Sequence, residues 1–251
     1  MFFRKKKVKS EKAFGKISAY CKYELYMERY RSASDFVTLE HRNRDGLRLL
    51  DVGSGSGQLK YFCDFGNIDW HGVEISQKAI GKCRDLGYKM YECDAETEPL
   101  PFEDTSFDLV VASHVLEHLS DREFALKEMS RVLKPGGLLI IGIPVKPFLT
   151  NHLLTLYYRF KTIPKGGTRW AVHLFSLKRF LRRCLGERFE LVDVRGFRFI
   201  SARSRANWEN YEAFYKANVW FGKLCPSLTR EVNIVLRKTG IGSTDELAHE
   251  R

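Results

Sequence analysis

The sequence has few cysteines, and nothing in their spacing indicates a zinc site or a disulfide framework. Its six cysteines are scattered over 251 residues with no C-x-x-C pair, whereas zinc sites and disulfide-rich domains place cysteines at short, regular spacings. Long apolar runs are also lacking. No stretch approaches the roughly 20 apolar residues that span a bilayer, and the start, MFFRKKKVKS, has no apolar signal-peptide core. We therefore expect reduced cysteines, no metal site and a cytoplasmic protein.

Acidic residues are scarce at both ends of the chain, so the net charge of +11 is unevenly distributed. Residues 1–50 contain 13 basic and 6 acidic residues, residues 51–145 contain 9 and 16, and residues 146–251 contain 20 and 9. Basic flanks around an acidic middle favour contact with an anionic partner, such as a phosphorylated substrate, a nucleic acid or a membrane surface. A basic exterior that is merely solvated explains the charge equally well.

Short apolar segments alternate with helical ones from residue 48 onward, which is the pattern of βαβ units in a mostly parallel sheet. Strands are expected at Arg48–Val52, Trp70–Ile75, Lys89–Cys93, Phe107–Ala112, Leu138–Ile143, Phe189–Val194 and Glu231–Arg237. Their nearly continuous apolar character predicts a sheet with helices on both faces. One connecting helix has a predicted capping box, Ser120 with Glu123, and the breaker KPGG at its end.

Three regions fall outside this alternation. A helical pattern over residues 14–30 predicts a helix that lies against the domain. Two aromatic insertions are expected to form a lid, and the last residues are polar and expected to fray. The expected boundaries are a basic segment and helix that cover the site at 1–45, one α/β domain at 46–240 with insertions at about 145–172 and 196–228, and a polar tail at 241–251.

A glycine-rich loop, LLDVGSGSGQ, spans the end of the first expected strand. Glycine lets backbone approach a ligand closely, and a helix that starts at the loop offers free N–H groups. The third glycine of a dinucleotide fingerprint would fall at Gln58, and the Gly-Lys-Ser/Thr ending of a phosphate loop is absent. On its own the loop also fits an ordinary turn. However, Glu74 and Asp94 end the next two strands at the same sheet edge, which predicts a nucleotide-like ligand with its ribose on Glu74.

These segments, in this order, resemble the class I S-adenosylmethionine-dependent methyltransferases, of the methyltransferase type 11 or ubiquinone-biosynthesis-like group. The resemblance rests on LLDVGSGSG, GVEIS, CDAETEPLPFEDTSFDLVVASHVLEHL and RVLKPGGLLIIGIP, which cover about residues 47–145. It implies a Rossmann-like, seven-stranded, mostly parallel sheet with an antiparallel last strand. It also implies S-adenosyl-L-methionine as methyl donor, with S-adenosyl-L-homocysteine as product.

Carried over position by position, the resemblance implies a donor site with four parts. Asp51, Gly53, Gly55 and Gly57 would surround the methionine portion, Glu74 would bind the ribose, Asp94 and Ala95 would flank the adenine, and Ser113 would lie beside the sulfonium and its methyl group.

A histidine is the expected general base if the methyl acceptor is a hydroxyl, because histidine titrates near neutral pH. The candidates are His114, His118, His152 and His173. We favour His173, which precedes a helix in the segment expected to cover the pocket, and place His114 second. A structural role remains the alternative for each of them.

The acceptor is left open by the sequence. After the fourth strand the chain has ASHV. Amine-methylating nucleic-acid enzymes of the resembled fold often carry an Asn/Asp-Pro-Pro-aromatic motif at this place, and RNA cytosine C5 enzymes need a cysteine nucleophile there, and this chain has neither. We therefore expect transfer, at oxygen, to a small-molecule, glycan or lipid-linked acceptor. The insertions would contact it, and ANVWFGKLCPSL could touch an anionic membrane peripherally. The alternatives are a tRNA or other nucleic-acid methyltransferase and a non-catalytic donor-binding module; no oligomeric state is predicted.

Overall fold

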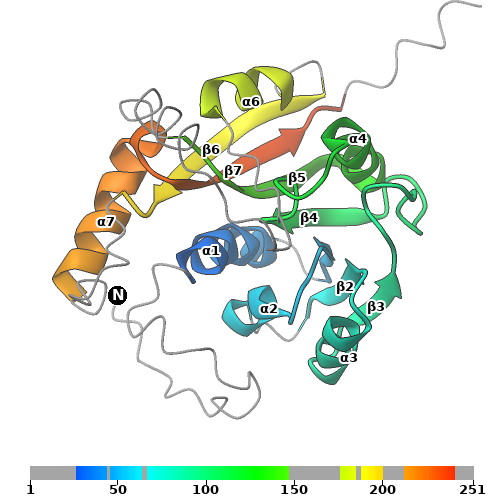
Figure 1. Cartoon of the computed structure of the whole chain (residues 1–251). Helices are drawn as coiled ribbons and strands as arrows, with labels where there is room; N and C mark the ends of the chain where they lie inside the picture. Colours follow the sequence, from blue (N-terminus) through cyan, green and yellow to red (C-terminus); the bar gives the residue numbers. More distant parts are fainter. Residues whose placement is uncertain are drawn as a thin grey trace, which may run out of the picture.

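A seven-stranded sheet forms the centre of the molecule (Figure 1). The structure, a computed structural model, describes residues 27–43, 46–63, 67–146, 176–184, 188–199 and 212–240. The strands are β1 Arg48–Val52, β2 Asp69–Glu74, β3 Lys89–Glu92, β4 Phe107–Ser113, β5 Leu133–Pro144, β6 Phe189–Phe197 and β7 Glu231–Lys238. All seven expected strands are therefore present, and β5 and β6 are longer than expected.

The strand order is β3-β2-β1-β4-β5-β7-β6, and β7 alone runs antiparallel to its neighbours. The predicted Rossmann-like topology is thus confirmed. The chain reverses its direction of winding between β1 and β4, and ligands of such sheets bind outside the carboxyl ends of the strands at this point. Because β7 runs the opposite way, its first residue, Glu231, lies at the same edge, in register with Pro144 and Phe197.

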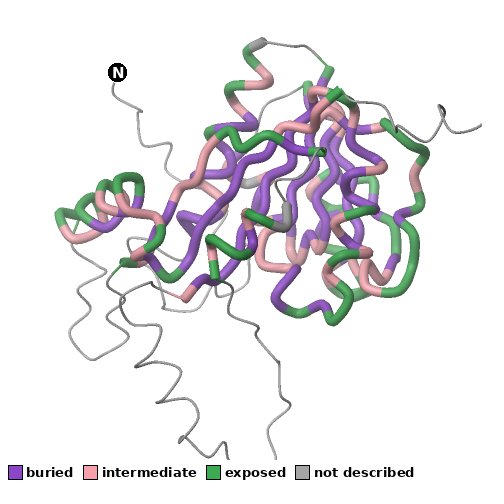
Figure 2. Tube along the Cα trace, turned by 90° about the horizontal axis from the view of Figure 1, so that it is seen from above, coloured by how far each residue is buried: buried purple, intermediate pink, exposed green. Residues whose placement is uncertain are grey.

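Helices cover both faces of the sheet, as expected. The helices are α1 Glu28–Asn43, α2 Gln58–Phe62 and α3 Gln77–Asp85 on one face, α4 Arg122–Val132 and α6 Leu177–Cys184 on the other, and α7 Glu212–Leu224 with the 3₁₀ turn η3 Pro226–Leu228 beside β6. Alternate residues of each strand face opposite ways: Leu49 packs with α1 and α2, whereas Leu50 packs with α4. The inner strands are consequently buried, whereas much of the edge strands β3 and β6 and the outer helix surfaces are exposed (Figure 2).

Two local predictions are corrected by the structure. Asp121, not Ser120, caps α4, because its Oδ1 accepts a hydrogen bond of 3.0 Å from the backbone N–H of Phe124. The KPGG sequence does not separate helix from strand. Strand β5 already begins at Leu133, and Gly136, at a φ of 74°, lies within it.

The helix at the start of the described chain is α1, which the sequence analysis did not predict. The expected helix over 14–30 falls mostly on residues outside the described part, as do much of the first insertion and residues 200–211 of the second. The remainder of the second insertion forms the end of β6, α7 and η3. The lid therefore stays a prediction.

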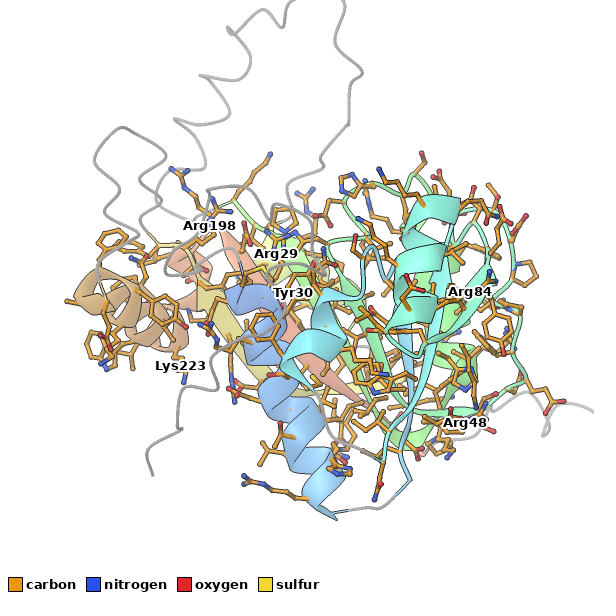
Figure 3. All side chains as sticks on the ribbon, turned by 90° about the horizontal axis from the view of Figure 1, so that it is seen from below. Arg29, Tyr30, Arg48, Arg84, Arg198 and Lys223 are labelled. Carbon is orange, nitrogen blue, oxygen red and sulfur yellow. The ribbon has the colours of Figure 1, made fainter. Side chains whose placement is uncertain are left out.

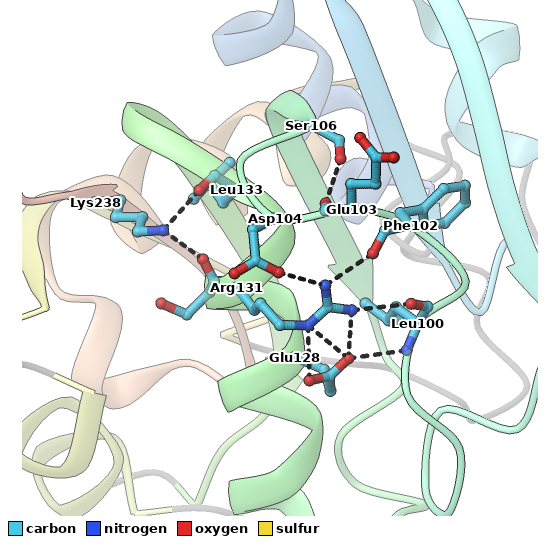
Figure 4. A network of polar contacts seen from close by, with 10 residues as sticks. Leu100, Phe102, Glu103, Asp104, Ser106, Glu128, Arg131, Leu133 and Lys238 are labelled. Carbon is cyan, nitrogen blue, oxygen red and sulfur yellow. Dashed lines mark hydrogen bonds and ion pairs between the residues drawn. The ribbon is translucent and has the colours of Figure 1, made fainter. Parts of the chain in front are cut away.

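The loop after β3 is fastened to α4 by a network around Arg131 (Figure 4). The guanidinium group of Arg131 donates to Glu128, to Asp104 and to the carbonyl oxygens of Leu100 and Phe102. Glu128 in turn accepts a 2.9 Å hydrogen bond from the backbone N–H of Leu100, and the Arg131 guanidinium beside Glu128 lowers the pKa of its carboxyl. This network fixes the segment between β3 and β4 to the end of α4, at the amino ends of β4 and β5.

Candidate functional site

The glycine loop between β1 and α2 has the backbone geometry that only glycine adopts readily. Gly53, Gly55 and Gly57 have φ angles of 63°, 54° and 73°. A Cβ on Gly53 would lie 2.4 Å from Cγ2 of Val115, so this loop is in direct contact with the segment after β4. A Cβ added to Gly55 would meet only Oε1 of Gln58, at 3.4 Å, so this side of the loop is almost open.

Glu74, at the end of β2, joins the glycine loop to the next helix. Its Oε2 accepts a hydrogen bond of 3.0 Å from the backbone N–H of Gly55, and its Oε1 accepts from the N–H groups of Ile75 and Ser76 at 3.0 and 3.1 Å. An ionised carboxylate has about four acceptor positions. The half-buried Glu74 therefore retains acceptor capacity beside the open side of the loop.

Asp51, in β1, is buried beneath the loop. Its Oδ2 accepts a hydrogen bond of 3.1 Å from the hydroxyl of Tyr88, which itself lies under α3. Burial raises the pKa of Asp51 to about 7. The hydrogen bond from Tyr88 opposes this increase in part, and the charge of Glu74 adds to it. The site thus contains a carboxyl group that titrates near neutral pH.

The raised pKa of Asp51 predicts a pH-dependent cost to stability. Since the folded-state pKa lies above the unfolded value, the contribution of Asp51 to stability is full below about pH 4 and is lost as the pH rises toward 7. Asparagine does not ionise, so Asp51→Asn lacks this loss. We expect the free energy of unfolding of Asp51→Asn, relative to that of the natural protein, to rise by about 2 kcal/mol from pH 5 to pH 8. Urea unfolding of both proteins across this range measures the difference, and parallel stability curves would contradict it.

The other predicted donor residues lie at the same edge. Asp94 follows β3, and its Oδ1 accepts a 2.9 Å hydrogen bond from the backbone N–H of Glu96. Ala95 packs against the core on the α4 face. Ser113 ends β4 with its Oγ buried and without a hydrogen-bond partner among the described residues. All eight predicted donor residues are therefore brought to one edge of the sheet by β1, β2, β3 and β4.

His114 follows Ser113 at the point where the strand order reverses. Its φ of 60° is unusual for a residue other than glycine, and such backbone strain is concentrated at functional sites. Its Nδ1 lies 2.8 Å from Oε1 of Glu117, and its Nε2 lies 3.4 Å from Oε2 of Glu231. The His114 side chain is 11 % exposed. His118 is exposed, and His173 and His152 lie outside the described residues.

His114 belongs to a group of five charged or titratable side chains, which we term the edge cluster: Arg29, His114, Glu117, Arg198 and Glu231. Glu231 links them. Its Oε2 lies 2.9 Å from Nη2 of Arg29, and its Oε1 pairs with Arg198. Figure 3 shows Arg29 and Arg198 close together at this edge.

Arg29, Glu117 and Glu231 are buried, His114 and Arg198 are nearly so, and the charges of the edge cluster compensate one another. Burial alone would raise the pKa of Glu231, but Arg29, His114 and Arg198 together hold that pKa below its ordinary value. Two arginines and two glutamates balance formally when the imidazole is neutral. Buried charges in such an arrangement mark candidate functional sites.

Of this cluster, only His114 was expected from the sequence. The four other members come from α1, the turn after β4, the end of β6 and the start of β7, and Arg29 is 202 positions away from Glu231. One signal was available for Glu231, which opens an otherwise apolar strand, EVNIVLRK. The structure gives no metal centre among the residues that it describes, and none of the helices described is long and apolar enough to cross a membrane.

Comparisons with known proteins agree with this geometry. Residues 50–141 match the family described as a methyltransferase domain. The ubiquinone/menaquinone biosynthesis C-methyltransferase UbiE of Vibrio campbellii is 36 % identical in an alignment of 135 residues that covers 49 % of this chain and 52 % of the relative. The UbiE protein of Laribacter hongkongensis is 34 % identical over 137 residues, 49 % of this chain and 54 % of the relative. The chain thus spans about half the length of the curated relatives it matches.

Solved structures share the fold at low identity. A Thermotoga maritima S-adenosylmethionine-dependent methyltransferase, described as a possible histamine N-methyltransferase, matches with a TM-score of 0.54 and 22 % identity over 86 % of this chain and 93 % of the other. The [4+2]-cyclase SpnF matches with a TM-score of 0.55 and 23 % identity over 84 % and 81 %. The match over residues 50–141 and the UbiE relatives support a class I S-adenosylmethionine-dependent methyltransferase domain of the ubiquinone-biosynthesis-like group, a family whose cofactor is S-adenosyl-L-methionine, and the solved structures show that the fold is shared.

Proposed function

We propose that this protein transfers a methyl group from S-adenosyl-L-methionine to a small-molecule, glycan or lipid-linked acceptor that lies between the glycine loop and the edge cluster. The observation that carries the proposal is the direct contact between the two halves of the site. Val115, next to His114, packs on Gly53, so the loop expected to hold the donor adjoins the side chains able to handle a proton.

The residues present fit the donor. The almost open side of Gly55 can receive the methionine portion, and the remaining acceptor capacity of Glu74 suits the hydroxyls of a ribose. Asp94 and Ala95 would then flank the adenine, and Ser113 would offer its buried hydroxyl near the methyl group. The sulfonium supplies an already activated methyl group, so the task of these residues is mainly alignment.

His114 is the general-base candidate that the described residues support. With its Nδ1 proton donated to Glu117, the neutral ring has a lone pair on Nε2. That nitrogen would accept the proton of the acceptor as the new bond to the methyl carbon forms, while the electron pair of the broken bond remains on sulfur. His173, favoured from the sequence, stays the competing proposal for the same role.

We propose that the methylated atom is either an oxygen or a carbon, not oxygen alone as expected from the sequence. Oxygen was the methylated atom expected from the sequence, whereas the UbiE relatives are named C-methyltransferases. An acidic C–H and an O–H both lose a proton during methylation, so one base serves either acceptor. We therefore propose an acceptor that carries a hydroxyl or a carbon activated by a neighbouring oxygen.

Donor binding should depend on Glu74. We expect Glu74→Ala to weaken binding of S-adenosyl-L-methionine by about 1.5–3 kcal/mol, the range for hydrogen bonds to a charged group. Isothermal titration calorimetry measures the change, with Glu190→Ala, an exposed glutamate on β6, as the matched control. An affinity equal to that of the natural protein would contradict the ribose assignment.

Methyl transfer itself is tested with donor labelled on the methyl group. The purified chain is incubated with fractions of a cell extract, and labelled products are separated and analysed by mass spectrometry for a one-methyl mass increase. Label in a small molecule or lipid supports the proposal, and label in RNA favours the nucleic-acid alternative. Donor binding without label in any fraction favours the non-catalytic module.

A further inference from the structure

Helix α7 has one face that is exposed along its whole length. The exposed positions recur every three or four residues and are Glu212, Ala213, Lys216, Ala217, Trp220, Lys223 and Leu224. Trp220 and Leu224 are 64 % and 61 % exposed, which places them among the three most exposed large apolar side chains in the described part of the chain. They follow one another by four residues, so they form a single apolar patch on this face.

Packing on the other face fixes the orientation of α7. A Cβ on Gly222 would lie 1.9 Å from the carbonyl oxygen of Gly196, so the helix backbone lies directly against β6. The ring of Phe221 lies 4.0 Å from that of Phe199, and the hydroxyl of Tyr215 donates to Glu28 of α1 at 2.5 Å. Because the helix is held from this side, it cannot turn its apolar patch inward.

Lysines lie beside the apolar patch. Lys216 and Lys223 share the exposed face, and the single acidic residue of α7, Glu212, is paired with Lys216 at 2.9 Å at the start of the helix. Residues 146–251 as a whole contain 20 basic against 9 acidic residues. An apolar patch with tryptophan and leucine, bordered by lysines whose stems can lie along it, is typical of helices that bind in the interface of an anionic bilayer.

We propose that α7 docks this protein, lying flat, on an anionic lipid bilayer through Trp220 and Leu224, with Lys216 and Lys223 at the level of the headgroups. The helix has 13 residues, about 20 Å, which is too short to cross the hydrocarbon core. Tyr215 ties α7 to the start of α1, next to Arg29 of the edge cluster. A docked α7 thus holds the candidate site close to the lipid surface. The docking does not depend on methyl transfer.

Sedimentation of the full chain with lipid vesicles tests this proposal. We expect the protein to sediment with vesicles of phosphatidylcholine and phosphatidylglycerol at low salt and much less with phosphatidylcholine alone. The double variant Trp220→Ser/Leu224→Ser should bind the anionic vesicles about tenfold or more weakly. Leu39→Ser, a half-exposed leucine on α1, is the matched control and should bind as the natural protein does.

Three results would overturn the docking surface. The first is no sedimentation with anionic vesicles, and the second is equal binding by the natural protein and the double variant. The third is a dimer, seen by sedimentation velocity of the natural protein and lost in the double variant, because the patch would then join two copies of the chain. Thermal unfolding of each variant verifies that a loss of binding does not reflect a loss of folding.

Discussion

Replacing His114 with alanine is expected to lower kcat by about 10²–10⁴-fold, the usual contribution of a general base. Affinity for S-adenosyl-L-methionine should change little, since the predicted donor contacts come from the glycine loop, Glu74 and Asp94. The imidazole is oriented by Glu117 at 2.8 Å and by its nearness to Glu231, so its replacement removes the group that would take the proton from the acceptor. Steady-state kinetics with an identified acceptor, together with donor calorimetry, separates the two effects.

His118→Ala is the matched control for this experiment. His118 lies in the same turn after β4, but its side chain is exposed, so turnover should stay near that of the natural protein. Unchanged turnover in His114→Ala would show that the base assignment is wrong. If His173→Ala instead loses turnover with donor affinity intact, the base is the histidine that the sequence favoured.

Replacing Glu231 with glutamine is expected to destabilise the fold by about 3–5 kcal/mol, the cost of breaking a buried ion pair on one side. Glu231 lies between Arg29 and Arg198, and both members of the Arg29–Glu231 pair have side chains 7 % exposed. Without the carboxylate, two guanidinium charges remain in this buried region with less compensation. Chemical denaturation at pH 7 measures the loss.

The stability that Glu231 provides has a defined pH dependence. Its folded-state pKa lies below the ordinary value, so its contribution is present above that value and is lost as the pH falls through the folded pKa. The difference between the natural protein and Glu231→Gln should accordingly shrink in acid. Glu190→Gln, on the exposed side of β6, is the control and should cost little. A cost below about 1 kcal/mol for Glu231→Gln would refute the compensation within the edge cluster.

The sheet could be predicted from the sequence because its signal is local. Strands such as β1 and β4 are short apolar runs between turn residues, and this pattern survives in any context that covers both faces. One error arose where two local signals competed, because Asp121 and Ser120 both suit a helix cap. Helix α1 was not predicted, and the helix expected over 14–30 stays a prediction.

Part of the candidate site could likewise be predicted from the sequence, and part could not. The glycine loop, Glu74 and Asp94 lie at the ends of successive strands, so their convergence follows from topology and could be predicted. The edge cluster could not, because Arg29 and Glu231 meet only after α1 packs beside β7. The pairing of His114 with Glu117 lies within one turn but depends on the positive φ of His114, which no sequence pattern indicates.

The central claim is that the carboxyl edge of this sheet binds S-adenosyl-L-methionine through the loop that follows β1. Its most direct test is a calorimetric titration of the full chain with S-adenosyl-L-homocysteine, the product of the donor, which avoids turnover. We predict saturable binding of one molecule per chain, weakened about ten- to hundredfold in Glu74→Ala. A folded protein that takes up no ligand at concentrations up to about 1 mM would contradict the account.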